Sequence, residues 1–182
     1  MRTRMTGAIL ATLIAIGCGG GAAPESSATG IPASSHDEFV TAACAAFDAL
    51  DTAIGNPDTG SGSKLSKALD AAVAAGDLAN ANRLADQSIQ TLEEGRKHLA
   101  IAGGWAPGSA MAAAADRFFV ATEALVNGKR AGVATRDVRA GQVAFEQAGG
   151  LQAWQAMITA AGSIQLPPGT SPKPCPNVAI QL

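Results

Sequence analysis

Apolar residues recur every three or four positions along much of the chain, a spacing that places them on one face of an α-helix. The first such stretch begins at Ser35, which forms a capping box with Glu38, and it ends at Gly55 and Pro57. Its expected inward face consists of Val40, Ala43, Phe47, Leu50 and Ile54.

The second helical stretch is predicted to begin near Ser63 and to end at the two glycines 103–104. Gly76 and Asp77 are a candidate interruption within it, since a glycine ends a helix readily and an aspartate caps a new one. This region is therefore either one broken helix or two helices in succession.

A third helix is predicted to begin within residues 107–109 and to be followed by Gly132. Thr135 is then the expected N-cap of a fourth helix, which breaks at the glycines 149–150 and is followed by a short last helix. The fourth helix is expected to turn Val138, Phe145 and Ala148 inward.

The pattern predicts an all-α domain over residues 35–165, an antiparallel bundle of four main helices, some of them broken. We see no alternation of apolar and polar residues of the kind that strands show. Residues 166–182 carry Pro172, Pro174 and Pro176, which exclude a helix. They are expected to form an extended tail pinned to the bundle.

The first seventeen residues have the pattern of a secretory leader. Arg2 and Arg4 lie in a short basic segment, and residues 7–17 form an apolar stretch of about eleven residues. A membrane-spanning helix needs about 20 residues, so this stretch is too short to be one. Residues 1–17 are therefore predicted to be a signal peptide.

The sequence Ala15-Ile16-Gly17-Cys18 resembles the lipobox of bacterial lipoproteins, with Ala15 where that motif usually has Leu. The resemblance implies cleavage before Cys18 and attachment of lipid to its thiol. It also implies an exported protein anchored to a membrane of the cell envelope. Gly19 in place of Asp slightly favours the outer membrane if the source is Gram-negative.

Residues 18–34 are predicted to be the lipidated cysteine and a flexible tether, because they are mostly Gly, Ser, Ala and Pro. Cleavage would remove Arg2 and Arg4 and leave 11 basic residues against 15 acidic ones. This balance gives no basic surface for nucleic acid. The membrane, through the lipid, and an envelope protein are the expected partners.

The chain has three cysteines, an odd number for an exported protein. If Cys18 carries lipid, Cys44 and Cys175 remain, and we expect them to form a disulfide that holds the tail on the first helix. Such a bond would place the protein in an oxidising compartment. The alternative is two separate thiols, with Cys44 simply buried.

Four cations, Lys129, Arg130, Arg136 and Arg139, flank one predicted interhelical loop. They are candidates to receive an anionic group of a ligand or partner, although charges at helix ends are commonly just solvated. Trp105, in a loop rich in glycine, is a further candidate partner contact if it is exposed, and a core residue if it is not.

No catalytic constellation stands out, and we predict no metal and no cofactor. Glu94 and His98 share a helix face, but di-iron bundles need two Glu-x-x-His motifs and further glutamates, which are lacking. His36, beside the first cap, is expected to be solvated. No G-x-S-x-G motif follows a predicted strand.

Together these features favour a non-catalytic lipoprotein of the cell envelope that binds another molecule through its helical domain. One alternative is a helical module that binds a small molecule or a metal between its helices. A third possibility is an enzyme whose acidic groups are brought together only by the fold.

Overall fold

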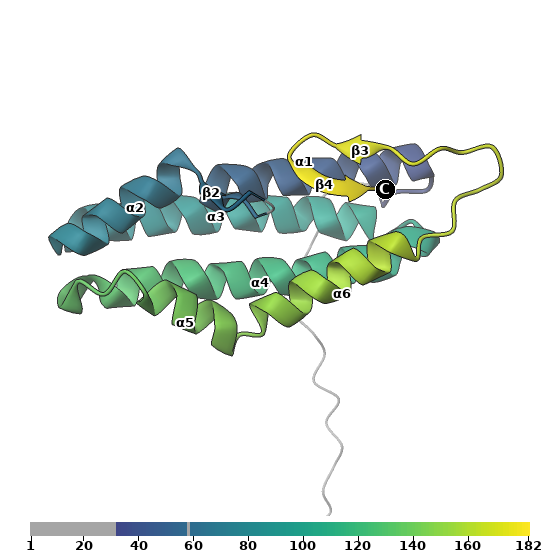
Figure 1. The fold of residues 1–182 in the computed structure, drawn as a ribbon. Coiled ribbons are helices and arrows are strands. Elements are labelled where there is room, and N and C mark those ends of the chain that lie inside the picture. Colours follow the sequence, from purple (N-terminus) through teal and green to yellow (C-terminus); the bar gives the residue numbers. More distant parts are fainter. Residues whose placement is uncertain (1–31, 58) are drawn as a thin grey trace, which may run out of the picture.

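The computed structural model describes residues 32–57 and 59–182, and this part of the chain is mostly α-helical (Figure 1). The prediction of an all-α fold class is confirmed for this part of the chain. The predicted signal peptide, Cys18 and nearly all of the tether lie outside the described residues. The α-helices are α1 (His36–Ile54), α2 (Lys64–Ala75), α3 (Leu78–Ala102), α4 (Ser109–Ala131), α5 (Ala140–Gln147) and α6 (Gly150–Gly162).

The helices lie in two layers, with α1, α2 and α3 in one and α4, α5 and α6 in the other (Figure 1). The long helices α3 and α4 face each other across the layers, α1 packs on α3, and α5 and α6 pack on α4. The core between them contains Phe39, Phe47, Leu92 and Phe119, each with no solvent exposure. Many alanines complete this core, so the helices approach one another closely.

The helix starts follow the predicted capping chemistry. The Ser35 side chain accepts a hydrogen bond from the Glu38 N–H, and the Glu38 side chain accepts one from the Ser35 N–H, which together form the capping box. Ser63 caps α2. Gly76 adopts a left-handed conformation with φ +72°, and Asp77 then caps α3. The candidate interruption therefore separates two helices.

The prediction for the fourth helix was wrong at its start. Gly132 stays right-handed, so the chain continues into a 3₁₀-helix, η2 (Gly132–Thr135), instead of beginning a new α-helix. The Thr135 hydroxyl bonds back to the Gly132 carbonyl and caps nothing downstream. Arg136 takes the left-handed conformation that turns the chain, and α5 starts only at Ala140.

This shift changes which side chains of that region face the core. Phe145 is buried as predicted, whereas Val138 lies before the helix and is 45% exposed. Ala148 is exposed as well. A second 3₁₀-helix, η1 (Ala106–Gly108), leads into α4.

Two small antiparallel strand pairs were not predicted. β1 (Gly55–Asn56) pairs with β2 (Ser61–Gly62) in the connection between α1 and α2. β3 (Pro174–Cys175) pairs with β4 (Val178–Gln181), so the tail folds back on itself as a hairpin. Strands of two to four residues are too short to show an alternating pattern, and this explains why the sequence did not reveal them.

The β3–β4 hairpin lies along α1 and is held there by a covalent bond and polar contacts (Figure 1). Cys44 and Cys175, 131 positions apart, form the predicted disulfide. Lys173 donates to Asp37 at 2.8 Å, and Asn177 donates to Asp48 at 2.6 Å. The tail also buries the apolar side chains of Val178, Ile180 and Leu182.

Removal of the disulfide is expected to destabilise the protein substantially. Closing so long a loop contributes on the order of 3–5 kcal/mol in the chain-entropy model. We therefore expect Cys44→Ala/Cys175→Ala, made in residues 19–182, to lower the free energy of unfolding in urea by a large part of that amount. A reductant should bring the unsubstituted chain to the same value and leave the double variant unchanged. A reductant that has no effect on the unsubstituted chain would contradict the bond.

Gly95 is expected to resist replacement by alanine, although alanine normally stabilises a helix. A Cβ at Gly95 would lie 2.5 Å from Cε1 of Phe119 and 3.1 Å from Cβ of Ala49. Overpacking of this kind costs about 1–3 kcal/mol, more than the roughly 1 kcal/mol of helix propensity that alanine adds. Thermal unfolding of Gly95→Ala should show the loss. Gly162→Ala in α6, where a Cβ would meet nothing within 4 Å, is the matched control and should lose none.

Candidate functional site

The structure does not assemble the four predicted cations into one anion site. Lys129 forms an ion pair with Asp70 of α2 at 2.6 Å, and Arg130 forms one with Asp86 of α3 at 2.8 Å. Arg136 and Arg139 are exposed. Two of the four cations are therefore paired with carboxylates of the other layer and are not free to bind an anionic ligand.

Trp105 is buried and belongs to the core. Its ring packs on Phe39, with centroids 4.9 Å apart, and on His36 at 5.4 Å. A buried indole offers no surface to a partner, so the core interpretation of Trp105 is the one that fits. The same contacts show that the expectation of a solvated His36 was wrong, because the Trp105 loop covers the start of α1. Neither ring nitrogen of His36 has a hydrogen-bond partner in the described part of the chain.

Glu94 and His98 do not converge with other metal ligands. Glu94 instead binds Lys97 at 2.7 Å. Within residues 32–57 and 59–182, no group of three or more His, Cys, Asp or Glu side chains is placed to hold a metal ion. His98 does, however, lie at the edge of a hollow between α1 and α3.

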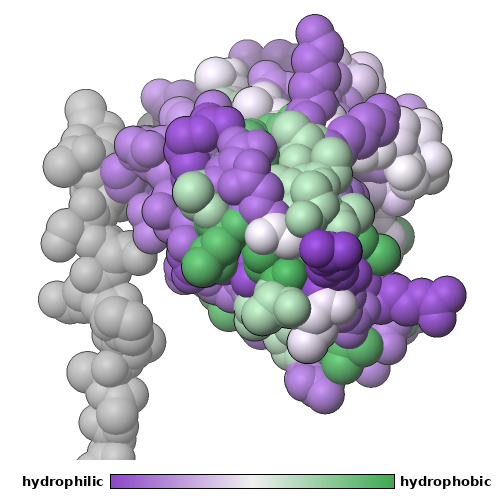
Figure 2. All heavy atoms as spheres, turned by 90° about the vertical axis from the view of Figure 1, so that its left-hand side faces the viewer, coloured by the Kyte–Doolittle hydropathy of each residue, from purple (hydrophilic) through white to green (hydrophobic). Residues whose placement is uncertain are grey.

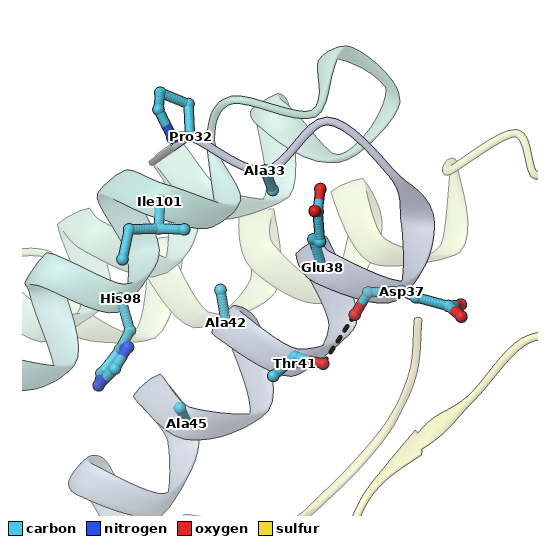
Figure 3. Close-up of a pocket in the computed structure, with 9 residues that line it drawn as sticks. All are labelled: Pro32, Ala33, Asp37, Glu38, Thr41, Ala42, Ala45, His98 and Ile101. Atoms are coloured by element: carbon cyan, nitrogen blue, oxygen red, sulfur yellow. Dashed lines mark hydrogen bonds between the residues drawn. The ribbon is translucent and has the colours of Figure 1, made fainter. Parts of the chain in front are cut away.

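That hollow runs between α1 and α3 and has a volume of about 470 Å³ (Figure 3). We call it the α1–α3 groove. Four of its side chains follow the i, i+3, i+4, i+7 spacing of one stripe of α1, and two come from α3. The lining residues are Pro32, Ala33, Asp37, Glu38, Thr41, Ala42, Ala45, His98 and Ile101.

The floor of the groove is formed by small apolar side chains. Ala33 and Ala42 are buried, and Ala45 is partly buried. The Ala33 N–H donates to the Ile101 carbonyl at 2.9 Å, which fixes the chain at the end of the groove near Pro32. Two alanines on α1 leave space that larger side chains would have filled.

The polar groups of the groove lie at its rim. The Glu38 carboxylate accepts hydrogen bonds from Ser34 and Ser35, and these bonds, that from the Ser34 N–H above all, lower the pKa of Glu38. Asp37 points away from the groove, and the bond from Lys173 lowers its pKa (Figure 3). The Thr41 hydroxyl donates to the Asp37 carbonyl.

Two other hollows have less to offer a ligand. A hollow of about 430 Å³ between α4 and α6 has Arg117 and Gln152 among otherwise small or apolar residues. Another of about 500 Å³ lies among α2, α4 and α5, and its charged groups, Lys129 and Asp70, already neutralise each other. The α1–α3 groove is therefore the better candidate site.

The end of the molecule formed by the C-terminal ends of α2 and α4 also exposes apolar groups. Apolar residues gather near the middle of this end, with hydrophilic residues mostly around them (Figure 2). Leu78 is 58% exposed there. The sequence did not point to this patch, because Leu78 follows directly on a cap and its exposure depends on how α2 and α3 meet.

A charged cluster joins the two layers away from these hollows. Arg96 of α3 contacts Asp116 at 2.7 Å and Glu123 at 3.4 Å, both on α4. Burial raises the pKa of Glu123, and the neighbouring Arg96 opposes this only in part. The cluster has the character of a structural link, because one arginine serves two carboxylates on the facing helix.

Comparison with known proteins gives no relative for the chain: no family model, no curated protein and no solved structure matches it. Within the part that the structure describes, no helix has both the length and the hydrophobicity to cross a bilayer.

The cluster predicts how Glu123→Gln alters the pH dependence of stability. Because the folded-state pKa of Glu123 lies above its usual value of 4.5, ionisation disfavours the folded chain. Below the usual pKa the carboxyl is protonated in both states, and this stability is fully present. It is lost as pH rises through the raised folded-state pKa of Glu123. Glu123→Gln cannot ionise, so we expect it to be more stable than the natural chain above this range and equal to it below.

Urea unfolding at several pH values measures this difference. Asp116→Asn is the control, because it removes the shorter contact of Arg96 and should lower stability at neutral pH. Stability curves for the natural chain and Glu123→Gln that stay parallel across the acidic range would contradict the assignment.

Proposed function

We propose that this chain is an exported lipoprotein of the cell envelope that acts without catalysis, by binding another envelope protein in the α1–α3 groove. The observation that carries the proposal is the position of this apolar groove. It opens beside Pro32, where the tether joins the helical domain. The lipid anchor at Cys18 and the partner are parts of the proposal.

The disulfide supports export. Cys44 and Cys175 form a bond that cytosolic thiols would reduce in most bacteria, whereas oxidising compartments preserve it. The bond also consumes both thiols, so neither serves as a nucleophile. This agrees with a chain whose third cysteine, Cys18, follows a leader-like segment.

The position of the groove supports a role close to the membrane. If residues 18–34 are the flexible tether that their composition predicts, its r.m.s. span would be roughly 20–25 Å. A groove at the end of such a tether stays near the membrane surface. An integral or anchored envelope protein would then meet it at a high effective concentration.

A small molecule in the same groove is the second candidate. The His98 imidazole lies beside an apolar floor. One polar group beside apolar walls is the usual composition of a small-molecule site. The open form of the groove and its polar rim favour a protein partner instead.

The test places a photo-cross-linking amino acid at Thr41, an exposed residue of the groove, in cells that make the full chain. We expect the protein in the membrane fraction, released by detergent but not by salt, with one discrete cross-linked protein. The same amino acid at the exposed Ala134 is the control and should give no such product.

The second arm repeats the experiment with Cys18→Ala. Loss of the anchor should prevent normal processing of the leader and remove the cross-linked product. Unchanged membrane association of Cys18→Ala would reject the lipoprotein assignment. An absence of any Thr41 product in the anchored protein would reject the binding role of the groove.

A further inference from the structure

The groove runs lengthwise between two helices. α1 and α3 lie side by side, and the stripe of Glu38, Thr41, Ala42 and Ala45 runs along the trough between them. At 1.5 Å per residue this stripe covers about 10 Å, roughly two helical turns. A helix laid in such a trough inserts apolar side chains at i, i+3 or i+4, and i+7.

The distribution of polar groups also fits a protein segment. The lining residues that are buried, Ala33 and Ala42, are apolar, and the carboxylate of Glu38 is exposed at the rim. An apolar floor with a polar rim is the anatomy of a protein interface. A site built for a small molecule would place a polar group deep inside.

The charge of the surroundings selects the partner. α1 has no lysine or arginine over its 19 residues. Of its four acidic residues, Glu38 presents its carboxylate at the groove, whereas Asp37 and Asp48 bind Lys173 and Asn177 of the tail. No lysine or arginine lines the groove either. Lys173 is paired with Asp37, and Lys97 with Glu94 on α3. Within the described residues the Glu38 carboxylate accepts hydrogen bonds from Ser34 and Ser35 and has no cationic partner.

We infer that the α1–α3 groove binds a cationic amphipathic helix of about two to three turns, whose apolar stripe covers Ala42 and Ala45 and whose lysines or arginines face Glu38. This inference rests on the binding function proposed above and names the chemistry of the partner. An acidic helix would bring like charges together at the rim, which disfavours it.

The test is calorimetric titration of residues 19–182 with two synthetic 18-residue helices that share one leucine stripe. One carries lysine at its polar positions and the other carries glutamate. We expect the lysine helix to bind at least about tenfold more tightly than the glutamate helix. Salt should weaken its binding without abolishing it, because the apolar contacts remain.

Substitutions then separate binding in the groove from general attraction to an acidic protein. Ala45→Trp fills the partly buried edge of the α1–α3 groove and should lower the affinity for the lysine helix by about tenfold or more. Glu38→Gln keeps a capping side chain and should lower this affinity by a smaller factor. Ala134→Trp, at an exposed position of η2, is the matched control and should bind like the natural chain. Thermal unfolding of each variant verifies that it is folded.

Equal binding of both helices, or unaltered binding to a folded Ala45→Trp, would overturn the inference. So would sedimentation that shows a dimer of this chain disrupted by Ala45→Trp, since a second copy would then fill the groove. If the Thr41 cross-link persists in cells but neither synthetic helix binds, the inference of a cationic helix is wrong. The proposed binding function would then still hold.

Discussion

The close approach of three helices at Gly95 is the constraint on which the rest of the structure depends. There α3 has no side chain, and Phe119 of α4 and Ala49 of α1 lie where a Cβ of Gly95 would be. Because α3 packs on α1 within its own layer and on α4 across the layers, the approach at Gly95 couples the position of α1 to that of α4. The ion pairs of Arg96 and Lys129 add polar links between layers that are already in register.

With α3 on one side, α1 has two other faces, and the chain treats them differently. The β3–β4 hairpin covers one of them and is held by the disulfide and by the contacts of Lys173 and Asn177. The other face carries the small residues of the groove and receives no element of the described chain. Since burial of apolar area is the main driving force of association, the apolar floor of the groove is the natural place to look for binding.

Local signals explain which parts of this arrangement the sequence could predict. The caps at Ser35, Ser63 and Asp77 depend on a few neighbouring residues, and all three form as expected. The pairing of Cys44 with Cys175 followed from assigning Cys18 to lipid, and the pair is present. Such inferences need no knowledge of the packing.

Other features arise only from packing between distant segments. Thr135 looked like a cap, but Arg136 takes a left-handed turn, and Gly132 lies close to Asp137 and Ala140. His36 looked solvated until the Trp105 loop covered it. The α1–α3 groove could not be foreseen either, because alanines that line a hollow and alanines that fill a core have the same spacing.

The bond between residues 44 and 175 has a mechanical consequence for a protein held at one end. It closes a covalent ring that contains α2, α3, α4, α5, α6 and the last turns of α1. Tension between the tether and the residues after Cys175 would pass from residue 44 directly to residue 175. The polypeptide between them would carry little of that load. Traction along the chain would therefore strain the first turns of α1 and the hairpin, while most of the helical body stayed relaxed.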